Sequence, residues 1–271
     1  MAPQLLPFLN YGGMVLSILA TLVCVCCWLA PRGEATACHK KTAGTWAVNG
    51  DCDLAVIVEI TGELLVNGDR KDMHNLVAIK ATSDNRHFQV TGGKLTLEWL
   101  KLTRDENRIG GGVIVKQGEL FVTSCFFHKL KLSSQVINIE ESKATLVDTK
   151  IYMSEGGGGI YASSNSQVEL LNTDIHLCRT NENGGGLSIR DSSTLYIRGG
   201  EISNNTAPKG NGGGVYCVHK SNCTLDRTIL HGNIAIGGGG VYLEASTMSI
   251  QDSTIDSNQG NYGGGVDVQT K

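Results

Sequence analysis

The stretch "GGGVYCVHKSNCTLDRTILHGNIAIGGGGVYLEA", residues 212–245, opens and nearly closes on the same motif, a run of glycines followed by an apolar residue. Between the two runs lie short segments in which apolar and polar residues alternate, separated by polar turns. These segments have neither the spacing nor the length of helices, whereas alternation bounded by glycine and polar residues is typical of β-strands. The stretch therefore predicts one unit of an all-β fold.

The same motif recurs along most of the chain. Glycine runs precede an apolar residue at Val113, Ile160, Leu187, Val215, Val241 and Val266, in steps of 47, 27, 28, 26 and 25 residues. The step of 47 is about two periods, and Ile137 of "QVINIEE" occupies the gap. A second pattern, two apolar residues five positions apart, has a similar period: Leu97/Leu102, Val122/Phe127, Leu146/Ile151, Leu170/Ile175, Ile197/Ile202, Leu225/Leu230 and Ile250/Ile255. Two independent patterns with one period indicate an internal repeat.

A period of 24–28 residues with two or three short strands per unit indicates one coil of a parallel β-helix, a solenoid in which each coil stacks on the last. We expect about eight coils, with inward apolar residues forming ladders along the stack. In each coil the glycine run makes a sharp corner, because glycine has no Cβ and tolerates positive φ. The run "PKGNGGGVY" lacks the Lys-Ser/Thr ending of a phosphate-binding loop, so the sequence predicts no nucleotide or other cofactor.

The glycine runs pair with an apolar-x-x-Asn element, in which Asn205, Asn233 and Asn258 follow three positions after an apolar residue. This pairing resembles the GGA[ILV] and FxxN repeats of polymorphic outer-membrane proteins, and the wider pectin-lyase-like group of right-handed β-helices. The resemblance covers roughly residues 54–271. It implies an all-β fold, a right-handed parallel β-helix solenoid, and a surface-exposed, adhesin-like role. For the three asparagines, an internal amide ladder is favoured over a ligand-binding role.

The amino end differs from the repeats. Residues 1–31 contain no charged side chain, and Met14–Ala30 is an apolar run broken only by Ser17 and Thr21. A small-x-small site at residues 35–37 fits cleavage, whereas the run is at the short limit for a membrane span. We therefore expect residues 1–37 to be a signal peptide or a membrane anchor containing a hydrophobic helix, residues 38–53 a cap or linker, and residues 54–271 the β-helix.

The protein is expected to be membrane-associated, through Met14–Ala30, or secreted, with its β-helix extracellular or lumenal. The positive charges downstream of the apolar run leave the opposite topology open, because positive residues favour the cytoplasmic side. The last coil lacks its second half, the pair of apolar residues five positions apart, and no polar cap follows it, so we expect the β-helix to be truncated at its C-terminal end.

Candidate binding residues lie on the strand after each glycine run. Three outward positions there are tyrosines, Tyr161, Tyr216 and Tyr242, whose rings could stack on a sugar, anchor a protein partner, or simply stack along the sheet. Only one outward position on this strand, Asp267, is a carboxylate. Glycoside cleavage needs a carboxylate pair, so the sequence predicts no catalytic residues.

Nine cysteines include six outside the apolar run, an even number that permits disulfides in an oxidising compartment. Cys38–Cys52 could clamp the N-terminal end. Cys217 and Cys223 could form a local disulfide or stay reduced, or could bind zinc with His219, although three ligands do not make a known zinc motif. Asn204 and Asn222 begin N-glycosylation sequons.

The net charge of −3 argues against a nucleic-acid partner. The function expected from the sequence is a non-enzymatic surface or secreted module that is structural or adhesin-like and binds a glycan or a cell-surface protein. Two alternatives stay open: a polysaccharide-active enzyme of the pectin-lyase-like kind, and an inert structural spacer.

Overall fold

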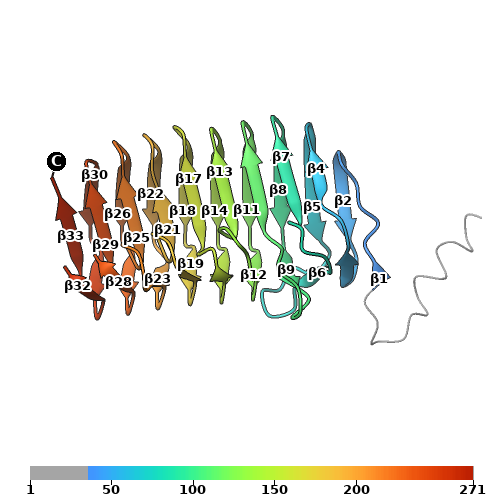
Figure 1. The fold of residues 1–271 in the computed structure, drawn as a ribbon. Coiled ribbons are helices and arrows are strands. Elements are labelled where there is room, and N and C mark those ends of the chain that lie inside the picture. The colour runs from blue at the N-terminus through green and yellow to red at the C-terminus, as the bar shows by residue number, and fades with distance from the viewer. Residues whose placement is uncertain (1–35, 271) are drawn as a thin grey trace, which may run out of the picture. The chain divides into compact units, whose positions relative to one another are not determined.

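The computed structural model describes residues 36–270, so the expected hydrophobic helix and the whole of Met14–Ala30 lie outside the described residues. Every regular element from residue 36 to residue 270 is a β-strand, and the strands form four sheets by parallel pairing. Figure 1 shows the coils stacked side by side in chain order, from β1 to β33. Within residues 36–270, no helix has the length and hydropathy needed to cross a bilayer.

Three long sheets form the sides of the solenoid, and we name them A, B and C. Sheet C follows each glycine run, and its strands are β4 (Val58–Ile60), β7 (Phe88–Thr91), β10 (Val113–Lys116), β13 (Ile137–Glu140), β17 (Ile160–Ser163), β21 (Leu187–Ile189), β25 (Val215–Val218), β29 (Val241–Glu244) and β33 (Val266–Gln269). Sheet B comes next in each coil, with strands β2 (Gly44–Val48), β5 (Glu63–Gly68), β8 (Lys94–Glu98), β11 (Glu119–Thr123), β14 (Lys143–Val147), β18 (Gln167–Leu171), β22 (Thr194–Arg198), β26 (Asn222–Asp226) and β30 (Thr247–Gln251).

Sheet A closes the coil after a short corner. Its strands are β1 (Thr36–Ala37), β3 (Cys52–Leu54), β6 (Val77–Ala81), β9 (Leu100–Arg104), β12 (Phe126–His128), β15 (Lys150–Tyr152), β19 (Asp174–His176), β23 (Glu201–Ser203), β27 (Ile229–His231) and β31 (Thr254–Asp256). A fourth, smaller sheet, D, lies between sheet A and the next glycine run, with strands β16 (Glu155–Gly156), β20 (Arg179–Thr180), β24 (Thr206–Ala207), β28 (Ile234–Gly237) and β32 (Gln259–Tyr262).

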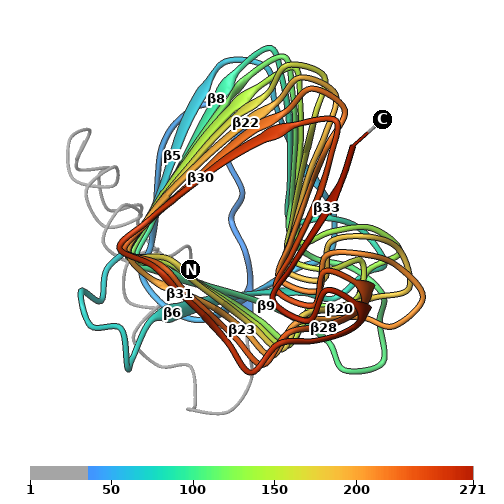
Figure 2. The same cartoon turned by 90° about the vertical axis from the view of Figure 1, so that its left-hand side faces the viewer.

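Figure 2 looks along the stack and shows a triangular coil whose sides are sheets A, B and C. The strands of sheet D and their loops, labelled at β20 and β28, bulge outward beside the corner between sheets A and C. Sheet D was not expected from the repeat pattern. Its loops form a wall along part of the outer face of sheet C, and this wall forms one side of a cleft described below.

The predicted ladders are confirmed residue by residue. Val113 pairs with Ile137, which pairs with Ile160, so the long step of 47 residues is indeed two coils. The ladder continues through Leu187, Val215, Val241 and Val266. The two members of each apolar pair lie in sheets B and A, as with Leu146 and Ile151. Inward residues of the three sheets form one continuous apolar core from Trp46 to Val241.

The predicted asparagine ladder is present at the corner after sheet A. Asn205 and Asn233 are fully buried, and the Asn205 Nδ2 donates to Asn233 Oδ1 at 3.1 Å and to Ile175 O at 2.9 Å. Asn233 Nδ2 donates in turn to Asn258 Oδ1 at 2.9 Å. These amides therefore satisfy backbone groups between coils, as buried polar groups must.

The other two corners have polar ladders that the sequence did not reveal. At the corner between sheets C and B, Ser142 N donates to Ser166 Oγ at 3.2 Å, and Ser166 N donates to Ser193 Oγ at 3.1 Å. At the corner between sheets B and A, Thr173 Oγ1 donates to Leu146 O at 3.2 Å. The signal for these ladders was present in the repeat, but serine and threonine in a turn do not by themselves indicate a buried position.

The solenoid is longer than expected at its beginning. Sheets B and C each contain nine strands, so there are about nine turns. Strand β2 pairs with β5 and strand β3 pairs with β6, which makes residues 44–54 part of the first coil. These residues had been assigned mainly to a cap or linker over 38–53.

Candidate functional site

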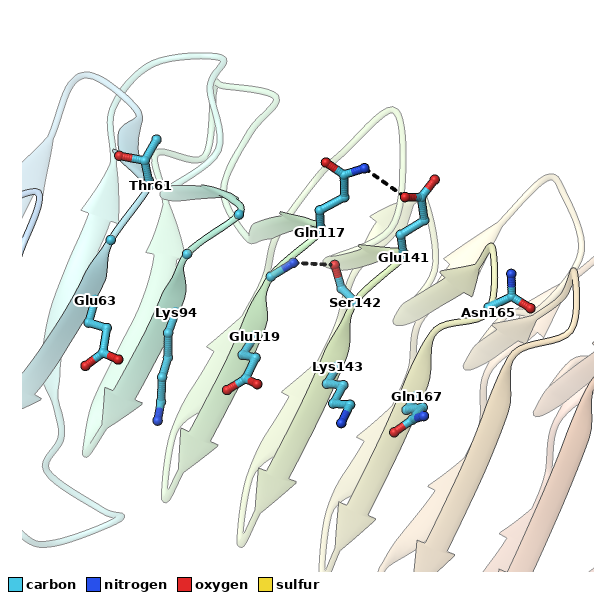
Figure 3. A pocket seen from close by; sticks show the side chains of 14 residues that line it. Thr61, Glu63, Lys94, Gln117, Glu119, Glu141, Ser142, Lys143, Asn165 and Gln167 are labelled. Atoms are coloured by element: carbon cyan, nitrogen blue, oxygen red, sulfur yellow. Dashed lines mark hydrogen bonds between the residues drawn. The ribbon is translucent and has the colours of Figure 1, made fainter.

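An open groove of about 640 Å³ follows the corner between sheets C and B (Figure 3). One edge is built from the turns that join the two sheets, and the other from the first residues of sheet B strands. It spans five consecutive coils, from Glu63 in the β5 coil to Gln167 in the β18 coil. A groove of this length suits an extended ligand.

The turns between sheets C and B place polar side chains at the rim of the groove, because the backbone bends sharply at the first residue of the turn. Gln117 and Glu141 both have positive φ, 52° and 49°, and both side chains are exposed. Gln117 Nε2 donates to Glu141 Oε2 at 2.8 Å, and below them Gly118 N donates to Ser142 Oγ at 3.0 Å (dashed lines in Figure 3). The rim is thus tied from coil to coil while its outer edge stays polar.

A row of outward side chains forms the second edge of the groove, and we call it the charged row. It comprises Glu63, Lys94, Glu119, Lys143 and Gln167, which are paired in register across β5, β8, β11, β14 and β18. Figure 3 shows the five side chains projecting from neighbouring strands. Because parallel strands lie roughly 4.8 Å apart, the row presents one polar group per coil at that spacing.

The charged residues of the row form no ion pairs with other residues in the range 36–270. The ion pairs formed by residues 36–270 involve other groups, such as Lys116 with Glu140 at 2.9 Å. Lys94 Nζ instead lies 4.8 Å from the centroid of the Phe121 ring, an attraction that positions the ammonium group over sheet B. The carboxylate, amide and ammonium groups of the row therefore remain available to a ligand.

The three tyrosines do not form the exposed stripe that the sequence predicted. Tyr216 and Tyr242 are only 6% and 9% exposed, with ring centroids 5.4 Å apart and planes inclined by 13°. The expectation of exposure was wrong for these two because the rings stack on each other and the glycine corners pack against them. A Cβ at Gly212 would lie 2.8 Å from the Cβ of Tyr216. Tyr161 is half-buried and separated from this pair by Ser188, so the three rings make no continuous surface.

Four of the cysteines in residues 36–270 form two disulfide bonds. Cys38 is bonded to Cys52, and Cys217 is bonded to Cys223. The second bond uses both sulfurs of the possible zinc cluster, and His219 Nδ1 lies 2.9 Å from Asp191 Oδ1. The zinc alternative is therefore wrong.

Two further cysteines, Cys125 and Cys178, are buried and free. Burial raises the pKa of each thiol to about 12, so both are protonated and unreactive. The sequon residues Asn204 and Asn222 are both exposed, and their glycosylation stays a prediction.

Sheet A contains a cluster of two acidic residues and a histidine. It was not predicted from the sequence, because only the outward positions that follow the glycine runs were considered there. Asp174 and Glu201 lie on adjacent strands, and Glu201 N donates to Asp174 Oδ1 at 3.1 Å. Between them, the His176 ring has Nε2 4.0 Å from Asp174 Oδ2 and Nδ1 4.0 Å from Glu201 Oε1. His176 Nδ1 also lies 2.5 Å from the Oγ of Ser203, but Ser203 is only 1% exposed. A buried hydroxyl is poorly placed to attack a substrate.

Comparison with known proteins bears on the fold. A family model described as "Right handed beta helix region" matches residues 108–270, more than half of the chain. A search of curated proteins finds no match. The match confirms the right-handed parallel β-helix expected from the repeats.

Two solved structures are similar at low identity. The tailspike protein of an Acinetobacter phage is 12% identical with a TM-score of 0.36, and the match covers 83% of this chain and 52% of that one. The ORF18 structure of Geobacillus virus E2 is 11% identical with a TM-score of 0.32, and the match covers 88% and 56%. The chain thus spans about half the length of each.

Proposed function

Because this chain belongs to the right-handed β-helix family, we propose that it is a non-catalytic recognition module that binds an extended glycan along the groove of Figure 3. Function has to be argued from the site, since a fold of this kind serves both enzymes and binding proteins. The charged row is the observation that supports the proposal.

The row fits a polymer of hydroxyl-rich units. Carboxylate and amide oxygens accept hydrogen bonds from hydroxyls, and lysine ammonium groups donate to hydroxyl or ring oxygens. Each coil offers one such group at a constant spacing, which suits a ligand that repeats along its length. Contacts made by several coils add, so a weak contact at each coil gives useful affinity overall.

A protein partner fits the groove less well. Protein interfaces depend on a few buried anchors, chiefly Trp, Tyr and Arg. The groove is lined instead by Thr, Glu, Gln, Lys, Ser, Asn and Gly residues. This composition favours a glycan over a folded protein.

We also propose that the β-helix acts outside the cytoplasm, attached to a membrane or secreted. The support is the pair of disulfides, Cys38–Cys52 and Cys217–Cys223, since such bonds persist in oxidising compartments. The two exposed sequons agree with this location.

The test is a glycan array probed with the full chain, followed by titration calorimetry on the glycans that bind. Glu119→Gln and Lys143→Gln each remove one charge from the row and should weaken binding about 10-fold, equivalent to roughly 1.4 kcal/mol. Glu59→Gln, an exposed carboxylate on sheet C, is the matched control and should bind as the unaltered protein does. Equal affinity in all four proteins would place the ligand elsewhere, and no bound glycan would favour an inert spacer.

The alternative of a polysaccharide-active enzyme has one observation in its favour, the acid pair Asp174 and Glu201 on adjacent strands. Carboxyl groups about 5 to 5.5 Å apart suit retaining glycoside hydrolysis. Incubation with glycans identified by the array, followed by detection of new reducing ends or unsaturated products, separates the two functions. Cleavage that disappears in Glu201→Gln would establish the enzyme and overturn the non-catalytic proposal.

A further inference from the structure

A second cleft lies on the outer face of sheet C, against the wall formed by the loops of sheet D, and we call it the sheet C cleft. It has a volume of about 270 Å³. Tyr161, Ser188 and Arg190 enter it from β17 and the end of β21, and Glu182, Asn183 and Lys209 enter it from the loops. It is therefore assembled from several coils, and no single repeat contains it.

The cleft has an excess of positive charge. Arg190 and Lys209 face a single carboxylate, Glu182. Behind the lining residue Gln135, the guanidinium of Arg86 donates through Nη1 to Gln135 O at 2.5 Å and to Val136 O at 3.1 Å. Burial lowers the pKa of Arg86 to about 10, so it remains charged at neutral pH. A buried cation held only by neutral groups favours an anion nearby.

Within residues 36–270, neither Arg86 nor Arg190 forms an ion pair with a carboxylate. The ion pairs formed by residues 36–270 with arginine involve Arg70, Arg198 and Arg227. Arg190 instead lies with its guanidinium carbon 5.9 Å from the centroid of the Tyr161 ring. Burial alone would lower the pKa of Arg190, but the Tyr161 hydroxyl offsets this and the pKa is raised, so Arg190 is fully charged.

Two polar atoms on this face also lack a hydrogen-bond partner. Arg190 Nε is a buried donor without an acceptor, and Asn138 Oδ1, on the strand beside Tyr161, is a buried acceptor without a donor. Unsatisfied groups of this kind are uncommon and call for an explanation. A ligand that brings both an acceptor and hydroxyl donors would complement the face after small side-chain movements.

We propose that the sheet C cleft binds one sugar residue bearing an oxyanion, a carboxylate or a sulfate ester, with the oxyanion between Arg190 and Lys209. The planar guanidinium matches the oxygens of either group. The half-buried Tyr161 ring offers an aromatic surface beside the charged group, as sugar rings require. The volume suits a single ring and is too small for a nucleotide. Asn183, whose Oδ1 accepts from Asn211 N at 2.7 Å, is held in place to contact the ring.

The experiment uses the full chain and titration calorimetry with matched small probes. D-glucuronate and galactose 6-sulfate test the two oxyanions, glucose and galactose are their neutral counterparts, and inorganic sulfate tests the anion alone. We expect each acidic sugar to bind at least about 10-fold more tightly than its neutral counterpart and than inorganic sulfate. Arg190→Gln should weaken acidic-sugar binding about 10-fold, whereas Arg190→Lys should retain part of it.

Lys209→Gln provides a second variant, since Lys209 is exposed and its replacement is not expected to affect folding. It should weaken binding about 3-fold, and Lys40→Gln, another exposed lysine, should have no effect. Equal affinity for acidic and neutral sugars, or unchanged affinity in both Arg190→Gln and Lys209→Gln, would overturn the proposal. Binding of inorganic sulfate as tight as that of the acidic sugars would overturn its sugar component. The sheet C cleft is separate from the Figure 3 groove, so substitutions in the charged row should leave these affinities unchanged.

Discussion

At the scale of single residues, His87 is a titratable group held entirely away from water. It is fully buried. Its Nε2 lies 2.9 Å from Thr103 O and 3.1 Å from Ile79 O, and its Nδ1 accepts from Gly112 N at 2.8 Å. These partners require a neutral ring with the proton on Nε2. Burial, the dominant cause, lowers the pKa of His87 from 6.5 to about 4.

This shift makes stability depend on pH. Between pH 6.5 and about 4 the unfolded chain binds a proton at His87 and the folded chain does not, so the free energy of unfolding falls as the pH is lowered through this window. At pH 4.5 the loss should be roughly 2 to 3 kcal/mol relative to pH 7.5. His87→Gln removes the titration, so urea unfolding of this variant should show a smaller loss between the two pH values. The exposed His74→Gln is the control and should behave as the unaltered protein does. A pH dependence that is the same in all three proteins would contradict this assignment.

These residue environments could not be predicted from the sequence. "DNRHF", residues 84–88, reads as a polar turn entering a strand, and nothing in it distinguishes a buried His87 and Arg86 from solvent-exposed ones. Tyr216 and Tyr242 show the same limit. Alternation correctly placed them on the outer side of sheet C, but only the packing of the glycine corners and of the two rings determines that this side is covered.

At the scale of elements, the glycine corner is the feature on which the stacking depends. Gly212 has a φ of 68°, a conformation that other residues adopt at a cost. A Cβ at Gly214 would lie 2.6 Å from Gly240 O in the next coil and 3.1 Å from Asn233 Nδ2. The third glycine of the run is therefore required by the contact between coils.

Gly214→Ala should accordingly destabilise the protein by more than about 2 kcal/mol, because the clash is with backbone that cannot move without separating two coils. Gly50→Ala is the matched control, since a Cβ there would meet nothing within 4 Å. It should change the free energy of unfolding by less than about 1 kcal/mol. Denaturant unfolding of both variants checks this, and similar losses in the two would show that the corner is not tightly packed.

The repeat pattern predicted some of the elements and missed others. The ladder positions from Val113 to Val266 and the apolar pairs of sheets A and B were predictable, because parallel in-register stacking makes residues one period apart neighbours. Sheet D was not predictable, since its strands are two to four residues long and their sequences share no apolar pattern. The charged row was readable in principle as the first residue of each sheet B strand, but its role as one edge of a groove depends on the turns beside it.

At the scale of the whole molecule, each coil contacts mainly the coils before and after it, so stability is set by local coil strength and by the interfaces between neighbours. Among the described strands, β2 and β4 of sheets B and C have a neighbour on one side only at the N-terminal end, whereas β3 of sheet A pairs with both β1 and β6. Cys38–Cys52 ties this end, closing a segment with a sequence separation of 14 residues. Such a bond limits the freedom of the unfolded segment.

Replacing both cysteines, Cys38→Ser with Cys52→Ser, should therefore loosen the end and leave the middle intact. Hydrogen exchange in β2 and β3 should become faster, by an amount equivalent to as much as about 3 kcal/mol, while exchange in β17 and β18 stays unchanged. The disulfide-intact protein is the reference. Uniformly faster exchange along the whole solenoid would show that the coils unfold as one cooperative unit.

The sequence by itself determined the repeat, the strand order within a coil, the inward ladders and the asparagine ladder. It could do so because a solenoid brings together residues separated by one constant period. Contacts between coils therefore appear in the sequence as a regular repeat. Only the tertiary structure decided which outer surfaces are open. The Figure 3 groove, the sheet C cleft and the covered tyrosines all arise where turns and loops from several coils pack side by side, and no period in the sequence encodes that packing.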